Sequence, residues 1–123
     1  MDDEIITLGG QRVLSCHPDG PRLTRESDAL DLLGSVWGQE VDWLAVPKAR
    51  LGPDFLTLRT GLAGAIIQKL VTYRIRLAIV GDISAEVAAS TALRDFVHES
   101  NGGRHVWFMP DMAAFEARLG SAR

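Results

Sequence analysis

A helix-like segment followed directly by an unbroken aliphatic run is the feature that most limits how this chain can fold. In the first segment, apolar residues recur every three to four positions, which is the helical period, at Leu62, Ala63, Ile66, Ile67 and Leu70. Residues 77–80 are all aliphatic, as in a parallel strand that is covered on both faces. Together they predict one helix–strand unit of an α/β protein with a largely parallel sheet.

Two short β-prone runs and one amphipathic helix precede that unit. Residues 5–8 and 12–16 flank the pair Gly9-Gly10, which predicts a hairpin because glycine adopts the positive φ angles of a tight turn. Ser27 is the expected N-cap of the helix that follows. A buried strand is then expected at residues 43–46.

The sequence after residue 80 predicts one more helix, a strand and a last helix. Ser84 or Ser90 is the expected N-cap of the first of these helices. That helix should end at Asn101-Gly102-Gly103, where Asn and Gly favour the left-handed conformation. A strand at 105–109 and a helix capped by Asp111 complete a mixed sheet of about five strands with about four helices.

Composition and charge limit the classes of binding partner and the cellular compartment that we expect. The chain of 123 residues is long enough for one domain, 1–123, and leaves no room for a second. Its net charge of −3 lacks the positive field that attracts nucleic acid, so we expect no nucleic-acid partner. No apolar run approaches the roughly 20 residues that cross a membrane. With one cysteine and no visible signal peptide, we expect a cytoplasmic protein without membrane contact.

The order of elements and the step Thr60-Gly61-Leu62 at the start of the central helix resemble the STAS domains, named for sulfate transporters and anti-sigma-factor antagonists. In that family, a Ser or Thr before Gly-Leu at the corresponding helix start is the regulatory phosphorylation site. The resemblance implies a STAS-like fold with Thr60 as the phosphoacceptor. The family usually has Asp two residues before this site, whereas this chain has Leu58 followed by Arg59.

Short motifs in the second half of the chain carry a closer resemblance. They are Thr60-Gly61-Leu62-Ala63-Gly64, Gln68-Lys69, Tyr73-Arg74, Gly81-Asp82, and Asp95-Phe96 with Glu99-Ser100-Asn101. These motifs are similar to an uncharacterised bacterial family, the domain-of-unknown-function family 4180, over about residues 41–119. That family has no established activity, so the resemblance implies membership but no reaction.

The start of the central helix is the first candidate site. Backbone N–H groups at a helix start are unpaired and favour negative charge, so a phosphate on Thr60 would be stabilised there, with help from Arg59. Asp82 follows the central strand at the carboxyl edge, where open α/β sheets bind ligands. The expected partner or ligand surface therefore consists of Arg59, Thr60, Gly61 and Asp82. The alternative is structural, with Thr60 and Asp82 serving as cap or turn residues.

Other polar and aromatic residues fit structural roles as well as functional ones. Gln68, Glu99 and Asn101 are a possible secondary polar patch, but charges near a helix end are also typical of a solvated face. The three tryptophans are expected in or near the core, at Trp37, Trp43 and Trp107.

The spacing of histidine and cysteine argues against a reactive centre. His98 and His105 lack a third ligand at metal-binding spacing. Cys16 and His17 are neighbours in a strand, so their side chains point to opposite faces. We therefore expect no metal, no cofactor and no catalytic residue.

These features favour a non-enzymatic, STAS-like regulatory or protein-interaction domain that binds a protein partner through the surface around Thr60. The alternative is a protein that binds a small anion or metabolite, with enzyme activity left open, through the same helix start with Arg59, Gln68 or Asp82. A homodimer formed by exposed apolar residues is a third hypothesis.

Overall fold

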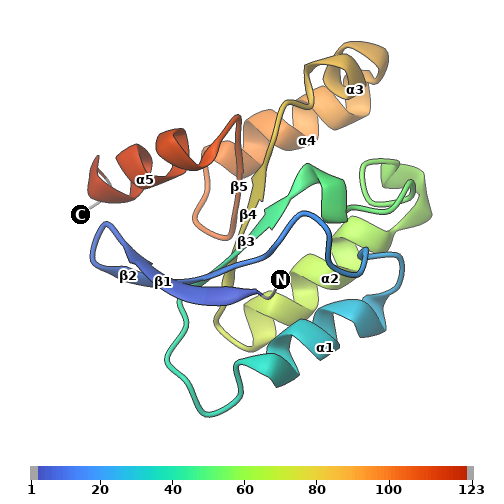
Figure 1. The fold of residues 1–123 in the computed structure, drawn as a ribbon. Coiled ribbons are helices and arrows are strands. Elements are labelled where there is room, and N and C mark those ends of the chain that lie inside the picture. Colours follow the sequence, from blue (N-terminus) through green and yellow to red (C-terminus); the bar gives the residue numbers. More distant parts are fainter. Residues whose placement is uncertain (1–2, 122–123) are drawn as a thin grey trace.

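The computed structural model describes residues 3–121, which form one mixed five-stranded sheet flanked by helices (Figure 1). The strands are β1 Glu4–Leu8, β2 Gln11–Ser15, β3 Trp43–Pro47, β4 Arg76–Val80 and β5 Val106–Met109. The helices are α1 Glu26–Ser35, α2 Leu62–Thr72, α3 Ser84–Ala89, α4 Thr91–Asn101 and α5 Met112–Ser121, with two 3₁₀ turns, η1 Lys48–Arg50 and η2 Leu58–Thr60. The predicted α/β class is confirmed. None of the described helices is long and apolar enough to cross a membrane.

The strands lie side by side in the order in which they occur in the sequence, β1-β2-β3-β4-β5. β1 and β2 form the predicted antiparallel hairpin, and its turn residues Gly9 and Gly10 have φ angles of 55° and 79°. The other neighbouring pairs are parallel. Because these crossovers all advance in one direction, right-handed connections place α1, α2 and α4 on one face. α5 covers the other face (Figure 1).

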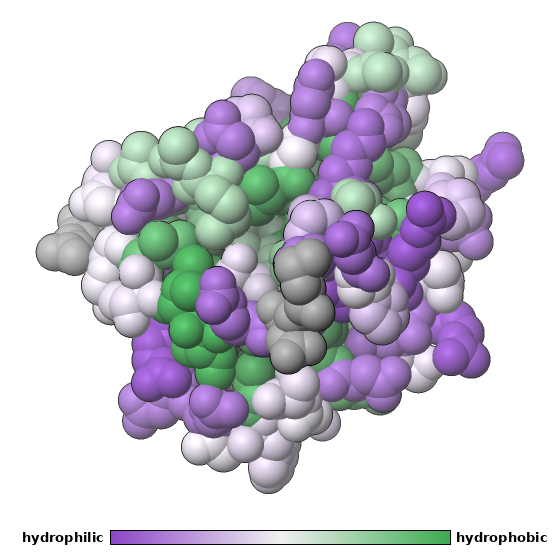
Figure 2. Space-filling view, viewed as in Figure 1, coloured by the Kyte–Doolittle hydropathy of each residue, from purple (hydrophilic) through white to green (hydrophobic). Residues whose placement is uncertain are grey.

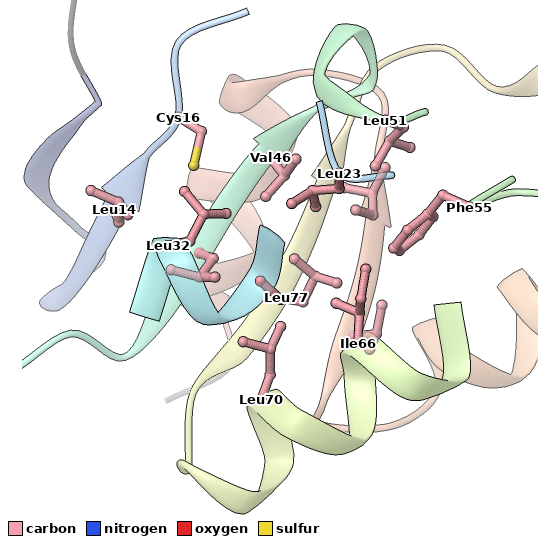
Figure 3. Packing of buried hydrophobic residues seen from close by; sticks show 14 of the residues in the cluster. Leu14, Cys16, Leu23, Leu32, Val46, Leu51, Phe55, Ile66, Leu70 and Leu77 are labelled. Atoms are coloured by element: carbon pink, nitrogen blue, oxygen red, sulfur yellow. The ribbon is translucent and has the colours of Figure 1, made fainter. Parts of the chain in front are cut away.

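The face that carries α1, α2 and α4 holds the larger part of the core (Figure 3). Alternate strand residues such as Leu44 and Leu77 point to this face, as the period of two in a strand requires. Ile66 of α2 is completely buried, on the apolar stripe that the sequence predicts. Phe55 is completely buried too, so the connection over residues 47–60 packs onto the body of the protein.

An aromatic cluster fills the opposite face beneath α5. The ring centroids of Trp43 and Trp107 lie 4.6 Å apart, and Phe115 of α5 meets Trp43 edge-on at 5.2 Å. Ala45 and Ala78 belong to the same cluster, and their small side chains leave room for the indoles. Figure 2 shows apolar atoms in the valley between α5 and the β1–β2 hairpin, so α5 covers this face incompletely.

α1 begins earlier than predicted. Ser27 lies inside the helix and is not its N-cap, because the carboxylate of Asp28 accepts hydrogen bonds from the backbone N–H groups of Thr24 and Arg25 at 2.8 and 2.9 Å. The bond from Thr24 is the main cause that lowers the pKa of Asp28. Trp37 follows the end of the helix and is 77% exposed, so the expectation that it lies in or near the core is wrong.

α2 and α4 end in different conformations. After α2, the N–H of Ile75 bonds to the carbonyl of Leu70 at 2.9 Å and that of Arg74 to Val71 at 3.0 Å, which is a Schellman motif. Arg74 takes the left-handed position with φ 60°, where glycine is usual. The left-handed end predicted for α4 is wrong, since Gly102 has φ −81° and its N–H continues the right-handed turn to the carbonyls of that helix.

Replacing Arg74 by glycine should raise the free energy of unfolding by about 0.5–1 kcal/mol. The left-handed conformation costs an L-residue roughly 1–2 kcal/mol, and the greater freedom of glycine in the unfolded chain offsets part of the gain. Urea denaturation measures the difference. Arg74→Ala is the control because it removes the side chain and keeps the unfavourable conformation, so an equal gain in both variants would contradict this account.

Candidate functional site

Four parallel strands, β2 to β5, end at the same edge of the sheet, which we call the carboxyl edge. α2 starts at this edge because it runs back across the sheet between β3 and β4 (Figure 1). Open α/β sheets bind ligands at this edge, since the loops after the strands and the starts of the helices converge there. The residues that follow the strands are therefore the first to consider for a site.

A groove of about 740 Å³ opens at this edge, and we call it the carboxyl-edge groove. One wall comes from residues 51–59 and the other from α3 and α4. The walls are largely apolar, from Leu51, Pro53, Leu56, Leu58, Ala89, Ala92 and Leu93. The charged lining residues among those described are Arg22, Lys48, Arg59 and Glu86. This lining suits an apolar group that carries negative charge.

Lys48 ties the end of β3 to α3 beside the groove. Its ammonium lies 2.7 Å from Oε2 of Glu86 and donates to the backbone carbonyl of Asp82 at 2.9 Å. The hydrogen bond from Lys48 is the main cause that lowers the pKa of Glu86. Neither Arg22 nor Arg59 has an ion-pair partner among residues 3–121. The positive charge that remains for a ligand therefore comes from these two arginines.

Thr60 is exposed at the corner where η2 meets α2. Its hydroxyl lies 2.9 Å from the backbone carbonyls of Asp54 and Thr57, and its oxygen accepts a long hydrogen bond of 3.3 Å from the N–H of Leu62. Gly61, with φ 76°, is the N-cap of α2 and has no side chain to cap the helix. Thr60 thus holds the preceding loop against the helix start, next to the groove wall at Arg59.

Asp82 is exposed and its carboxylate acts locally. It accepts a hydrogen bond from the N–H of Ser84 at 2.9 Å, and its contacts with Ser84 are the main cause that lowers its pKa. This is the geometry of a turn that begins α3. No hydrogen bond or ion pair joins Asp82 to Thr60 in the described part of the chain. Asp82 does not line the groove, but its backbone carbonyl accepts a hydrogen bond from Lys48, which does.

The three residues of the secondary polar patch are not joined to one another by a hydrogen bond or an ion pair within residues 3–121. Gln68 is exposed on α2, and Glu99 is exposed near the end of α4. The side-chain oxygen of Asn101 accepts a hydrogen bond from the N–H of Phe108 at 2.7 Å. Asn101 therefore connects α4 to β5.

Arg50 is a buried charge that the sequence analysis did not single out. It is 2% exposed, and its Nη1 lies 2.9 Å from the carboxylate of Asp3. The guanidinium also donates to the backbone carbonyls of Pro21 and His17. It thus joins three segments that are distant in the sequence. A single arginine after a buried strand gives no sequence signal of this role, because most arginines at such positions are exposed.

Cys16 is buried in the same region, and its thiol points into the core (Figure 3). Burial is the main cause that raises its pKa to about 12, and the charge of Asp3 raises it further, while Arg50 lowers it. The thiolate is the reactive form of cysteine. Cys16 is therefore a packing residue. Within residues 3–121, no three side chains of His, Cys, Asp or Glu gather in a way that would hold a metal ion.

These observations define a small mixed α/β protein with a ligand-sized groove at the carboxyl edge of its sheet. The model of the family described as domain of unknown function (DUF4180) matches residues 8–119, and the chain belongs to this family. The match begins before residue 41, so β2 and α1 are also parts of the family's domain. No curated protein and no solved structure matched the chain.

Replacing Arg50 by methionine should lower the free energy of unfolding by about 3 kcal/mol, because removal of one partner from a buried ion pair leaves the other uncompensated. The carboxylate of Asp3 would lose its charged partner and keep only the N–H of His17, and two backbone carbonyls would lose the guanidinium as a donor. Urea denaturation measures the loss. Arg59→Met is the matched control at an exposed position and should change stability by less than about 0.5 kcal/mol. Similar values for the two variants would show that Arg50 is not a structural clamp.

Cys16 should resist a disulfide reagent in the native protein near neutral pH. A pKa of about 12 lowers the thiolate fraction by about a thousandfold relative to an ordinary thiol. Release of the chromophore from an aromatic disulfide reagent should be slow for the folded chain and fast after urea is added. Rapid reaction without urea would contradict the burial of this thiol.

Proposed function

We propose that this chain is a non-catalytic regulatory or protein-interaction domain that binds a segment of a partner protein in the carboxyl-edge groove. The observation that carries the proposal is the lining of this groove, with apolar walls and two arginines, Arg22 and Arg59, that have no ion-pair partner within residues 3–121. Such a lining favours an acidic segment with apolar side chains. The resemblance to STAS domains and the acidic composition support a regulatory role in the cytoplasm.

The apolar walls of the groove and its charged side chains would contribute differently to partner binding. Leu56, Leu58 and Leu93 would contact apolar anchors of the partner, which are the usual source of affinity at interfaces. Arg59 would pair with a carboxylate, and its planar guanidinium suits two parallel hydrogen bonds. Charge at the rim mainly speeds association and selects the partner.

Phosphorylation of Thr60 is the proposed control of this binding. The side chain is exposed and adjoins Arg59. A phosphate would add nearly two negative charges at a helix start that stabilises them. The phosphate would also compete with the acidic partner for Arg59, and its negative charge would repel the partner. The modified chain should therefore release the partner.

Affinity capture with the purified chain tests both the groove and the switch. The wild type and Thr60→Ala should retain the same partner, whereas Thr60→Glu should lose it because of the added charge. Arg59→Glu should lose it as well, since this substitution reverses a charge on the groove wall.

Thr72→Glu is the matched control, because Thr72 is an exposed threonine at the other end of α2. This variant should still retain the partner. If Thr60→Glu and Thr60→Ala captured the partner equally well, phosphorylation of Thr60 would not control binding. If Arg59→Glu captured the partner as well as the wild type does, the groove would not be the partner-binding site.

A small anionic metabolite is the second candidate for the same groove. The volume of about 740 Å³ favours it, because small-molecule sites usually measure about 300–1,000 Å³. A thermal-shift screen of anionic metabolites distinguishes the two. A ligand at about 100 times its dissociation constant adds about 2.7 kcal/mol to the stability. Stabilisation of the wild type that Arg59→Glu lacks would favour the metabolite over the protein partner.

A further inference from the structure

A pocket of about 580 Å³ lies at the opposite edge of the sheet, where α1 and α2 end, and we call it the amino-edge pocket. It opens between these two helix ends and the loop that leads into β3. Two aromatic side chains line it, and both are exposed, Trp37 by 77% and Tyr73 by 47%. Exposed aromatic rings that share one pocket indicate a surface for binding, because their apolar area is otherwise left in water.

The backbone holds both aromatic residues in defined positions. The N–H of Trp37 bonds to the carbonyl of Gly34 at 3.3 Å, and Gly38 turns the chain directly afterwards with φ 83°. The N–H of Tyr73 bonds to the carbonyl of Lys69 at 3.2 Å, before the Schellman motif that ends α2. The two rings therefore project from capped helix ends.

The surroundings of the two rings are negative. Glu40 and Asp42 are the charged residues among the described lining of the pocket, which includes no Lys, Arg or His. Two helices end here, and a helix carries partial negative charge at its C-terminus. Lys69, the basic residue in the last turn of α2, is paired with Glu26 at 3.5 Å. The pocket thus complements a cation.

We propose that the amino-edge pocket binds a lysine or arginine side chain of a partner protein. A cation over the face of Trp37 or Tyr73 is attracted by the quadrupole of the ring. Glu40 and Asp42, which line the same pocket, add charge attraction. The apolar lining residues Val36, Val41 and Ile75 contact the methylene stem that such a side chain carries. The charge is opposite to that of the carboxyl-edge groove, so the two surfaces select different chemistry.

A titration of the isotope-labelled full chain with a short capped peptide of glycine, lysine and arginine tests this pocket. The indole N–H signal of Trp37 should shift in a saturable way, whereas those of the buried Trp43 and Trp107 should stay in place. Trp37→Ala and Tyr73→Ala should each weaken binding by about two- to fivefold. Glu40→Gln and added salt should weaken it too.

Two control variants accompany the titration. Leu30→Ala removes an exposed apolar side chain of α1 that does not line the pocket, and it should bind as the wild type does. Arg59→Ala alters the other edge and should also bind normally. Unchanged binding in Arg59→Ala keeps this test independent of the carboxyl-edge groove.

Four results would overturn the proposal. The first is no response to millimolar basic peptide, and the second is equal binding of a matched peptide of glycine, glutamate and aspartate. The third is a shift with tetramethylammonium but none with the peptide, which would assign the pocket to a small cation. The fourth is a dimer in sedimentation that Trp37→Ala abolishes, which would assign the pocket to a second copy of this chain.

Discussion

The burial of β3 and β4 on both faces is the constraint on which the rest of the structure depends. Leu44 and Leu77 point to α1, α2 and α4, whereas Trp43 and Ala78 point to α5. Strands that are covered on both sides are apolar throughout, so polar and charged groups collect where the strands and helices begin and end. The two edges of the sheet therefore carry the candidate sites, one positive and one negative.

Those parts of the fold that depend on periodicity could be predicted from the sequence. The stripe that contains Ile66 and the aliphatic run at 77–80 define α2 and β4 because burial alone determines them. Caps were predicted unevenly, since Ser90 and Asp111 cap α4 and α5 as expected, whereas the start of α1 was misplaced. At α1, the carboxylate of Asp28 accepts hydrogen bonds from backbone N–H groups that precede the helix, so the helix begins before Ser27. The helix expected after β4 is divided at Ser90 into α3 and α4. There the hydroxyl of Ser90 accepts a hydrogen bond from the N–H of Leu93 and starts α4.

Sequence reasoning led to one wall of the carboxyl-edge groove and not to the whole groove. Arg59 lines it, but Arg22 and Lys48 come from segments that no motif spacing connects to Arg59. The structural role of Arg50 could not be predicted either, because its guanidinium joins three segments that are distant in the sequence. Trp37 was expected in or near the core because tryptophan usually lies there, yet the helix ends before it.

Amide hydrogen exchange of the free chain and of its complex with the captured partner tests most directly whether recognition occurs at the carboxyl edge. Exchange should slow on binding in residues 51–60 and 84–93, which form the two walls of the groove and its corner. It should stay unchanged in β3 and β4, which are buried in the free chain. Unchanged exchange in both walls, in a complex that forms stably, would contradict the assignment of the groove.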